Sequence, residues 1–461
     1  MRKPEILSPA GDFTCLQAAL DAGADAVYFG LGTFNMRARS GVNFREEDLP
    51  EIARRCRDCG AKAYLALNAI MFEGETAEVA RVLDAAKPYV DAAIVSDWGV
   101  IALCRERGAK AYLALNAIMF EDETGAVERT IIAAKPFVDA FIVSDWGVIS
   151  LCRRHGAVFH VSTQMSTSNS GAVRFLASQG AARVVLAREC TLSEVSRIAA
   201  AVPSVEIECF VHGAQCVAES GRCFMSHDAF GKSACRGECN QPCRRRFLVK
   251  AVDFFEDDAG NPVHESDTAF IVEPHTVMSA RDLCSLGFID RLIAAGIASF
   301  KIEGRARNAD YVRTVTAAYR RAVDAVLAGE YTEKLAKTLV ESVKTVFHRE
   351  FSKGLYFGRP GADQFTDSEN SLATTVKRHI GIVADYFIKA GIAQVKVQDH
   401  ELAVGDTVQI HGPTTGVVEL KVEGLRRDDE VLERAGRGTW ATLKTPRCRV
   451  GDKVFYIERR G

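Results

Sequence analysis

EILSPAGDFTCLQAALDAGADAVYFG, residues 5–30, shows the pattern that decides the fold. Two short apolar runs, Glu5–Ser8 and Ala26–Gly30, are typical of buried strands. Between them, Phe13–Ala22 has apolar residues three and four positions apart, which indicates a helix with one buried face. A strand, a helix and a second strand in this order predict a βαβ unit with parallel strands.

The same alternation continues through residue 305. Helical spacing recurs between further strand candidates, for example in Thr76–Tyr89 and Leu192–Ala201. A long series of βα units predicts an α/β fold with a (β/α) TIM-like barrel, and an open doubly wound sheet is the alternative. The predicted strands are Glu5–Ser8, Ala26–Gly30, Ala63–Asn68, Ala92–Ser96, Ala111–Asn116, Ala140–Ser144, Val158–Ser162, Arg183–Ala187, Val205–Val211 and Ser299–Ile302.

A repeat with a period of 48 residues lies inside this series. AKAYLALNAIMFE at Ala61–Glu73 recurs without change at Ala109–Glu121, and the likeness continues so that residues 61–104 match residues 109–152. Each copy holds two βα units, which raises the predicted strand number from the usual eight to ten. Because strand number, tilt and shear are linked in a closed barrel, we expect either an enlarged barrel or one displaced copy.

Beyond residue 305 the pattern changes twice. Asn308–Ala328 and Glu333–Phe347 predict helices that pack on the barrel, and Gly354–Thr375 reads as a polar linker. Residues 376–461 consist of short alternating runs between glycine turns, which predict a small C-terminal β-barrel. The predicted domains are therefore a (β/α) barrel at 1–305, a helical extension and linker at 306–375, and the β-barrel at 376–461.

Composition limits the class of protein. The chain has 461 residues, 48% apolar and 26% charged, and a net charge of −2 that gives no overall attraction to nucleic acid. The β-rich end alone carries 15 Lys or Arg against 12 Asp or Glu, which permits contact with RNA. We expect no membrane span and no secretory signal, because the sequence lacks the apolar runs that they need. Fourteen cysteines without an export signal then favour the reducing cytoplasm.

A cysteine-rich loop, residues 212–246, follows the ninth predicted strand. Thiolates are ligands of both iron–sulfur clusters and zinc. The spacing here differs from the paired C-x(2–4)-C knuckles of structural zinc sites and favours an iron–sulfur cluster, with zinc and unligated buried thiols as alternatives. Five cysteines fall within 28 residues of this loop: Cys216, Cys223, Cys235, Cys239 and Cys243.

Polar residues follow several of the predicted strands. In a (β/α) barrel these positions face the active site. Arginine and lysine there would bind carboxylates or phosphates, whereas glutamate and histidine could act as acid or base. A structural ion pair is the alternative for neighbours such as Arg188 and Glu189. The substrate-binding candidates are Asn35, Arg37, Gln164 and Arg188, and the catalytic candidates are Glu189, His212, Lys301, Glu303 and Arg305.

Four blocks carry a family resemblance: VHGAQCVAESGRCFMS, GECNQPCRR, MSARDLC and SFKIEGRARNADYV. In this order they resemble signature blocks of the collagenase-like peptidase family, peptidase family U32, and the likeness extends from PEILSPAGD to HREFSKGLYFGRPG. It is greatest for the long form with a C-terminal β domain, which includes tRNA 5-hydroxyuridine hydroxylases. The resemblance implies a 4Fe–4S cluster. Its ligands would be Cys216, Cys223, Cys239 and Cys284, with Cys243 as the alternative to Cys239.

The resemblance implies three candidate functions. The first is an iron–sulfur enzyme that adds a 5-hydroxyl group to the wobble uridine of tRNA without molecular oxygen, with prephenate, a small dicarboxylate, as co-substrate. The second is a peptidase, although the sequence has no HExxH or GxSxG signature. The third is a cluster-bearing subunit that assists a homologous hydroxylase partner.

Overall fold

The structure is a computed structural model. It describes residues 3–30, 44–67, 90–95, 111–115, 124–135, 140–216, 218, 223, 225–231, 242–244, 249–250, 254–256, 262–264, 269–270, 279–304, 307–358, 365–366, 368 and 370–460.

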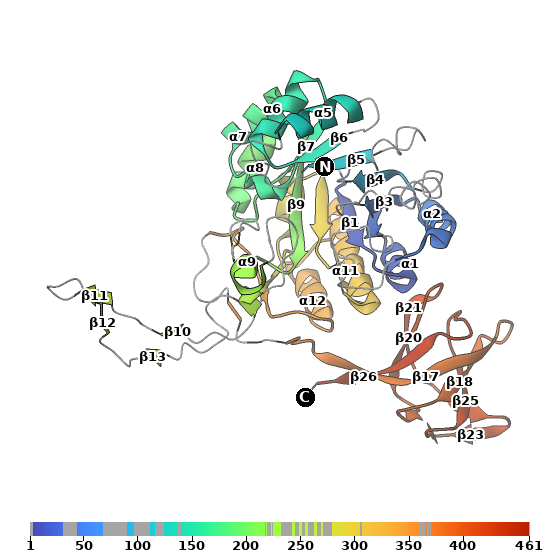
Figure 1. Cartoon of the computed structure of the whole chain (residues 1–461). Helices are drawn as coiled ribbons and strands as arrows, with labels where there is room; N and C mark the ends of the chain where they lie inside the picture. Colours follow the sequence, from blue (N-terminus) through green and yellow to red (C-terminus); the bar gives the residue numbers. More distant parts are fainter. Residues whose placement is uncertain are drawn as a thin grey trace.

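Ten parallel strands form a closed ring in a TIM-like α/β arrangement (Figure 1). Strands β1 to β9 follow one another in chain order, and β15 pairs with both β9 and β1, which closes the ring. Each predicted strand of the first 305 residues is confirmed to within two residues at either end. The strands are β1 (Glu5–Pro9), β2 (Ala26–Gly30), β3 (Lys62–Leu67), β4 (Ala92–Val95), β5 (Ala111–Leu115), β6 (Ala140–Val143), β7 (Phe159–Val161), β8 (Ala181–Val185), β9 (Glu206–Gly213) and β15 (Ser299–Ile302).

Strands from both copies of the repeat belong to this ring. β3 and β4 come from residues 61–104, β5 and β6 come from residues 109–152, and β4 pairs with β5. The equivalent side chains Tyr64 and Tyr112 lie with their ring centroids 6.2 Å apart, although β4 separates their strands. Side chains that meet across an intervening strand point into the ring, so the interior of the ring holds one tyrosine from each copy.

Helices alternate with the strands and cover the outside of the ring (Figure 1). Side chains cap the starts of these helices. Asp12 accepts a hydrogen bond from Cys15 N at the start of α1 (Phe13–Asp21), and Thr191 and Glu194 form a capping box at the start of α8 (Leu192–Ala201). No described helix is both long and apolar enough to cross a membrane. The helices are α1 (Phe13–Asp21), α2 (Leu49–Asp58), α5 (Thr124–Ala134), α6 (Trp146–Arg154), α7 (Ser170–Ser178), α8 (Leu192–Ala201), α9 (Met225–Phe230), α10 (Ile289–Ala294), α11 (Ala309–Ala328) and α12 (Glu333–Val343), with the 3-10 turns η1 (Glu46–Asp48), η4 (Thr163–Met165) and η7 (Pro242–Arg244).

Two short strands extend the ring at its carboxyl end. β14 (Asp282–Cys284) runs antiparallel to the end of β9, with Cys284 opposite His212, and β16 (Phe351–Ser352) pairs in parallel with β14. Between β9 and β14 the chain also forms two separate pairs of strands, β10 (Val249–Lys250) with β13 (Ala269–Phe270) and β11 (Phe254–Glu256) with β12 (Pro262–His264). The RDLC block, predicted to carry a cluster ligand, is therefore a strand at the mouth of the barrel.

The C-terminal part consists of antiparallel sheets. Eight strands form one sheet in the order β21-β20-β26-β17-β18-β25-β22-β23, and β19 pairs with β24. Their inward side chains form a single core that includes Ile380, Val395 and Val454. The strands are β17 (Thr375–Phe387), β18 (Ile392–Val397), β19 (Leu402–Ala403), β20 (Thr407–Gly412), β21 (Gly416–Lys421), β22 (Leu425–Arg427), β23 (Glu430–Leu432), β24 (Arg434–Ala435), β25 (Trp440–Lys444) and β26 (Lys453–Arg459).

The hairpin of β20 and β21 packs against α1 and α11 and joins the two parts (Figure 1). Arg55, only 7% exposed, donates to the carbonyl oxygen of Pro413 in this hairpin and lies over the Phe13 ring at 4.8 Å. Lys377 Nζ lies 2.9 Å from Asp310 Oδ1 at the same contact. The hairpin therefore sets how the C-terminal sheets are placed on the barrel.

Candidate functional site at the barrel mouth

Six charged side chains form a network inside the ring. Glu208 on β9 is the most buried, with 4% of its surface exposed, and it accepts hydrogen bonds from Lys301 Nζ at 3.0 Å and from Arg183 Nη1 at 3.2 Å. Arg183 also bonds Glu206 at 2.7 Å and lies 3.7 Å from Glu5, which pairs with Lys62 at 3.3 Å. Three carboxylates thus match three cations. We call this set, Glu5, Lys62, Arg183, Glu206, Glu208 and Lys301, the lumen network.

The lumen network determines the pKa of Glu208 and holds the side chain of Lys301. Burial alone would raise the pKa of Glu208, but Lys301 and Arg183 outweigh burial and hold that pKa below its ordinary value. Lys301, predicted to be catalytic, is engaged by Glu208 and lies over the Phe210 ring at 5.4 Å. Glu5, Lys62 and Glu206 are the first residues of their strands, and this amino end of a barrel usually serves stability.

Three arginines converge at the other end of the ring, beyond the carboxyl ends of β9 and β15. Arg244 follows Cys243 and donates to the carbonyl oxygen of Gln215 at 2.6 Å, which is the residue before Cys216. Arg307 lies between β15 and α11, with its guanidinium carbon 3.5 Å from the centroid of the Phe347 ring. Arg349 lies over the same ring at 5.1 Å. We call Arg244, Arg307 and Arg349 the mouth arginines.

Asp282 on β14 is the carboxylate beside the mouth arginines. It is 3% exposed, and its Oδ1 lies 3.8 Å from Arg349 Nη1, too far for a hydrogen bond. Burial raises the pKa of Asp282 above its ordinary value although Arg349, Arg307 and Arg244 all oppose the rise. The charges of three guanidinium groups therefore act on one carboxylate whose charged form is disfavoured by burial.

Arg349 has unmet hydrogen-bonding capacity. Its residue is 8% exposed, and its Nε and Nη1 atoms have no hydrogen-bond partner among the described residues. Burial and the nearby Arg244 and Arg307 lower the pKa of Arg349, yet a guanidinium stays protonated at neutral pH. Buried donors without partners are rare in folded proteins, and a buried cation of this kind favours an anion with two oxygens in a plane.

The predicted site residues differ in where the structure places them. Arg188 reaches the mouth, where its guanidinium carbon lies 4.1 Å from the Phe210 centroid and Nη1 donates to Ala214 O at 3.3 Å. Glu189, Gln164 and Glu303 are described at or just beyond the carboxyl ends of β8, β7 and β15. Four predicted residues lie outside the described part of the chain: Asn35, Arg37, Cys239 and Arg305.

His212, another catalytic candidate, is a core residue. It is 2% exposed, its ring packs against Tyr311, Tyr319 and Phe351, and burial lowers its pKa to about 3. Nδ1 lies 3.3 Å from the Tyr319 hydroxyl, which donates to Val211 O at 2.6 Å. A neutral, enclosed imidazole of this kind holds the end of β9 in place.

Glycine at position 213 allows the strand ends to meet closely. Gly213 has φ +105, and a Cβ there would lie 2.8 Å from the carbonyl oxygen of Glu303. Any side chain would therefore both strain the backbone and push β9 away from β15. The close approach places the segment that carries Gln215 and Cys216 directly beside the segment that carries Arg307.

Four of the five cysteines predicted as possible cluster ligands lie in the described part of the chain. Cys216 is exposed, Cys223 and Cys243 are partly buried, and Cys284 is buried, where burial raises the pKa of its thiol to about 11. Among the described residues no three His, Cys, Asp or Glu side chains are grouped closely enough to hold a metal ion. The thiols have the right chemistry for an iron–sulfur cluster, but the described geometry does not form its ligand set.

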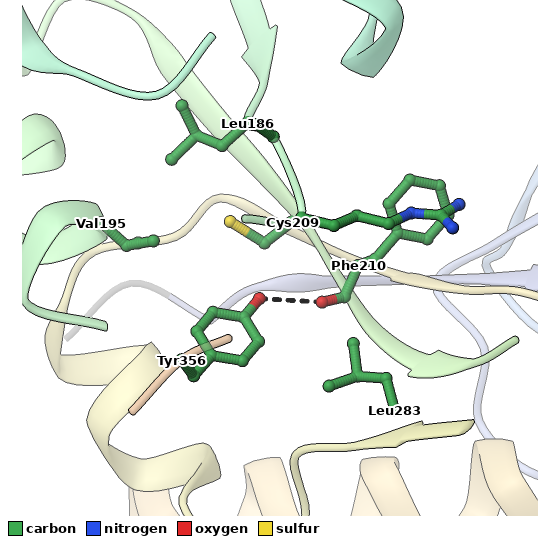
Figure 2. A pocket seen from close by; sticks show the side chains of 8 residues that line it. Leu186, Val195, Cys209, Phe210, Leu283 and Tyr356 are labelled. Carbon is green, nitrogen blue, oxygen red and sulfur yellow. Dashed lines mark hydrogen bonds between the residues drawn. The ribbon is translucent and has the colours of Figure 1, made fainter. Parts of the chain in front are cut away.

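One small cavity lies on the outer side of β9 (Figure 2). It has a volume of about 10 Å³, room for a single water, and is lined by apolar groups of Leu186, Leu283 and Cys209. The Tyr356 hydroxyl closes it by donating to Phe210 O at 2.8 Å. This cavity is too small to be a substrate pocket.

The mouth arginines and Asp282 were missed by the strand-end rule because they come from segments after the strands. Their signal was nevertheless present in the sequence. Arg244 lies in GECNQPCRR, Arg307 in SFKIEGRARNADYV and Asp282 in MSARDLC, while Arg349 lies in HREFSKGLYFGRPG. Read together, these blocks supply three arginines and one carboxylate to one place.

Comparison with known proteins places the chain in a family. A model of peptidase family U32 matches residues 11–107 and again residues 100–366. The chain is 34% identical to a collagenase of Porphyromonas gingivalis over 99% of this chain and 98% of that protein. It is 30% identical to tRNA hydroxylation protein P1 of Bacillus subtilis, over 89% and 84%. It is also 30% identical to a 23S rRNA 5-hydroxycytidine synthase of Escherichia coli, over 95% and 55%. The chain belongs to peptidase family U32.

Proposed function

We propose that this protein is an RNA-modifying enzyme that hydroxylates carbon 5 of the wobble uridine in tRNA, without molecular oxygen and with prephenate as co-substrate. Relatives named for tRNA hydroxylation and rRNA hydroxycytidine synthesis cover nearly the whole chain and support an RNA hydroxylase. The observation that carries the proposal is the group of three arginines at the barrel mouth, of which Arg349 is buried with two donors that lack hydrogen-bond partners among the described residues, next to the cysteine-rich loop.

The mouth arginines suit a small dicarboxylate. A carboxylate accepts two parallel hydrogen bonds from one guanidinium, and the Nε and Nη1 atoms of Arg349 are buried donors that lack a hydrogen-bond partner among the described residues. The opposite charge of a bound anion would also offset the repulsion among Arg244, Arg307 and Arg349. Glu189, Glu303 and Arg305 remain the proposed catalytic residues, and Arg37 and Arg188 the proposed further contacts to substrate.

We also propose a 4Fe–4S cluster on Cys216, Cys223, Cys239 and Cys284, with Cys243 as the alternative to Cys239. Such a cluster would supply a redox or Lewis-acid centre at the mouth. Protein purified without oxygen should contain about four iron and four sulfide per chain. Cys216→Ala should lose them, whereas Cys448→Ala, in the C-terminal core, should keep them.

Nucleoside mass spectrometry tests the activity. Transfer RNA from cells that lack this gene, grown without oxygen to silence oxygen-dependent enzymes, should lose 5-hydroxyuridine, and the wild-type gene should restore it. Arg349→Met should fail to restore it, while Arg54→Gln, an exposed arginine paired with Glu51 on α2, should succeed. Undiminished 5-hydroxyuridine in the deletion strain would refute the proposal.

A peptidase is the second candidate, favoured by the likeness to the collagenase. The described residues give it little chemistry. Burial raises the pKa of the Cys190 thiol to about 12 and that of the Cys284 thiol to about 11, and His212 is enclosed. A cysteine nucleophile needs the opposite shift, toward the thiolate at neutral pH. Release of labelled peptides from gelatin by the purified protein, abolished by Cys216→Ala, would favour the peptidase instead.

A further inference from the structure

One outer surface of the C-terminal sheet combines aromatic and cationic side chains. On β18 and β25 the residues Ala393, Val395, Ala441 and Leu443 point into the core, so the residues between them point outward. The register places Lys396 opposite Trp440 and Ile392 opposite Lys444. Residues directly opposite each other in an antiparallel pair share a face, so these four side chains form one surface.

The surface continues onto the neighbouring strands. Arg426 on β22 lies opposite Thr442, and Phe387 on β17 lies opposite Ile392. Lys453 on β26 lies opposite Ile382, which is itself opposite Lys396. We call this surface, consisting of Ile382, Asp385, Phe387, Ile392, Gln394, Lys396, Arg426, Val431, Trp440, Thr442, Lys444 and Lys453, the Trp440 face.

The composition of the Trp440 face differs from that of an ordinary solvated sheet. Trp440 is 42% exposed, Phe387 47% and Val431 69%. Four cations, Lys396, Arg426, Lys444 and Lys453, stand against one carboxylate, Asp385, while the acidic residues of the β22–β23 hairpin lie at its turn, residues 428–430. Lys396 Nζ lies 5.5 Å from the centroid of the Trp440 ring. A positive charge held beside an exposed aromatic ring is therefore the centre of the face.

The face is also free of the barrel. The C-terminal part contacts α1 and α11 through β20, β21 and Lys377 near the start of β17, whereas β18 and β25 lie on the side away from that contact (Figure 1). Within the described chain the Trp440 face is thus not used to join the two parts of the molecule.

We propose that the Trp440 face binds single-stranded RNA, with the Trp440 ring stacked on an unpaired base and Lys396, Lys444 and Arg426 contacting phosphates. Every base offers a flat face to an aromatic ring, and cations beside the ring neutralise the backbone, which is how sheet surfaces hold unpaired nucleotides. The inference rests on the proposed function and deepens it, because it assigns the grip on RNA to a surface distant from the reacting centre.

The test measures binding without turnover. Fluorescence anisotropy of the full-length protein with a labelled RNA stem-loop, and with the matching fully paired duplex, gives the affinity for unpaired bases. Trp440→Ala should weaken binding of the stem-loop about tenfold, since one stacked base is lost, and should change duplex binding little. Trp440→Phe should restore most of the affinity. Lys396→Gln should reduce the slope of log affinity against log salt by about one.

Two substitutions on α6 serve as matched controls. Trp146, 52% exposed, and Arg154, paired with Glu128 at the surface, lie on the barrel far from the C-terminal sheets (Figure 1). Trp146→Ala and Arg154→Gln should leave the affinity for the stem-loop unchanged. Near-ultraviolet circular dichroism of the Trp440 variants establishes that their fold is intact.

Outcomes separate this inference from the proposed function. If Trp440→Ala binds the stem-loop as tightly as the wild type while the wild type still produces 5-hydroxyuridine, the inference is overturned and the proposed function stands. Tight binding of the wild type to vesicles of anionic lipid, lost in Trp440→Ala with RNA affinity unchanged, would assign the face to a membrane and also overturn it. If Trp440→Ala loses affinity for the stem-loop as expected but the wild type produces no 5-hydroxyuridine, the inference about the face is supported and the proposed activity is refuted.

Discussion

Two charged sites in the barrel domain differ in how their charges are matched. The lumen network pairs each of its carboxylates with a cation within 3.7 Å, and its central Glu208 keeps a lowered pKa despite burial. At the mouth, three arginines lie near Asp282, whose pKa is raised, and Arg349 has two nitrogen atoms without a hydrogen-bond partner among the described residues. Matched charge stabilises the ring by itself, whereas unmatched charge needs something else to complete it.

Glu208→Gln gives the largest expected effect on this comparison. The substitution keeps the shape but leaves Arg183 and Lys301 facing each other without their carboxylate, so we expect a loss of about 3 kcal/mol in the free energy of unfolding. Urea denaturation measures it. Glu206→Gln is the matched control, because that side chain bonds the same Arg183 but is 36% exposed, and it should cost less than about 1 kcal/mol. Equal losses would show that burial does not distinguish the two carboxylates.

Acid should destabilise both regions through one histidine in each. Burial lowers the pKa of His160, in the ring, to about 4 and that of His212, at the mouth, to about 3. The unfolded chain takes up these protons near pH 6.5, so the stability is complete above pH 6.5 and falls as the pH drops toward the folded-state values. From pH 7 to 5 each histidine should cost about 2 kcal/mol. Urea denaturation across this range should show a shallower fall for His160→Gln; an unchanged slope would contradict the expectation.

Arg349→Met should give the smallest change in the free energy of unfolding, and this change should be an increase. Removing a buried cation that lacks a full partner relieves its desolvation and its repulsion with Arg244 and Arg307, so the free energy of unfolding should rise by about 1 kcal/mol in the absence of ligand. Arg183→Met, which removes the central cation of the lumen network, should instead lower it. Thermal denaturation of both variants measures the contrast, and a loss of stability in both would remove the distinction between the two sites.

The parallel ring was predictable from the sequence because its strands are short, apolar and separated by helices with a clear period. Ser299–Ile302 and Ala26–Gly30 were placed without error on that basis, and α8 was predicted at its observed bounds. The strand β14 was not predicted, since three residues within a polar block carry no period. Its place opposite β9 depends on pairing across a long separation, which a single sequence does not encode locally.

The site was predicted less completely than the fold, for a related reason. Arg188 and Glu189 follow the carboxyl end of β8, as the barrel rule predicts, and their role in the site stays a prediction. The same rule also named His212 and Lys301, which the packing of Tyr319 and the carboxylate of Glu208 draw into structural contacts. Arg349 was missed because its approach to Asp282 depends on how the chain returns after two long helices. Burial and pairing, not residue type, separate the groups that are available to a ligand from those that are not.

Gly416, the first residue of β21, determines how closely the hairpin of β20 and β21 packs against α1. It has φ +65, and a Cβ at this position would lie 2.9 Å from Asp21 Oδ2 and 3.3 Å from the backbone nitrogen of Ala18. A methyl group at this one position would strain the backbone and would press on Gln17 and Ala18 of α1, so β21 could no longer pack as closely against that helix. The distance between the Trp440 face and the barrel mouth therefore depends on the absence of a side chain at position 416.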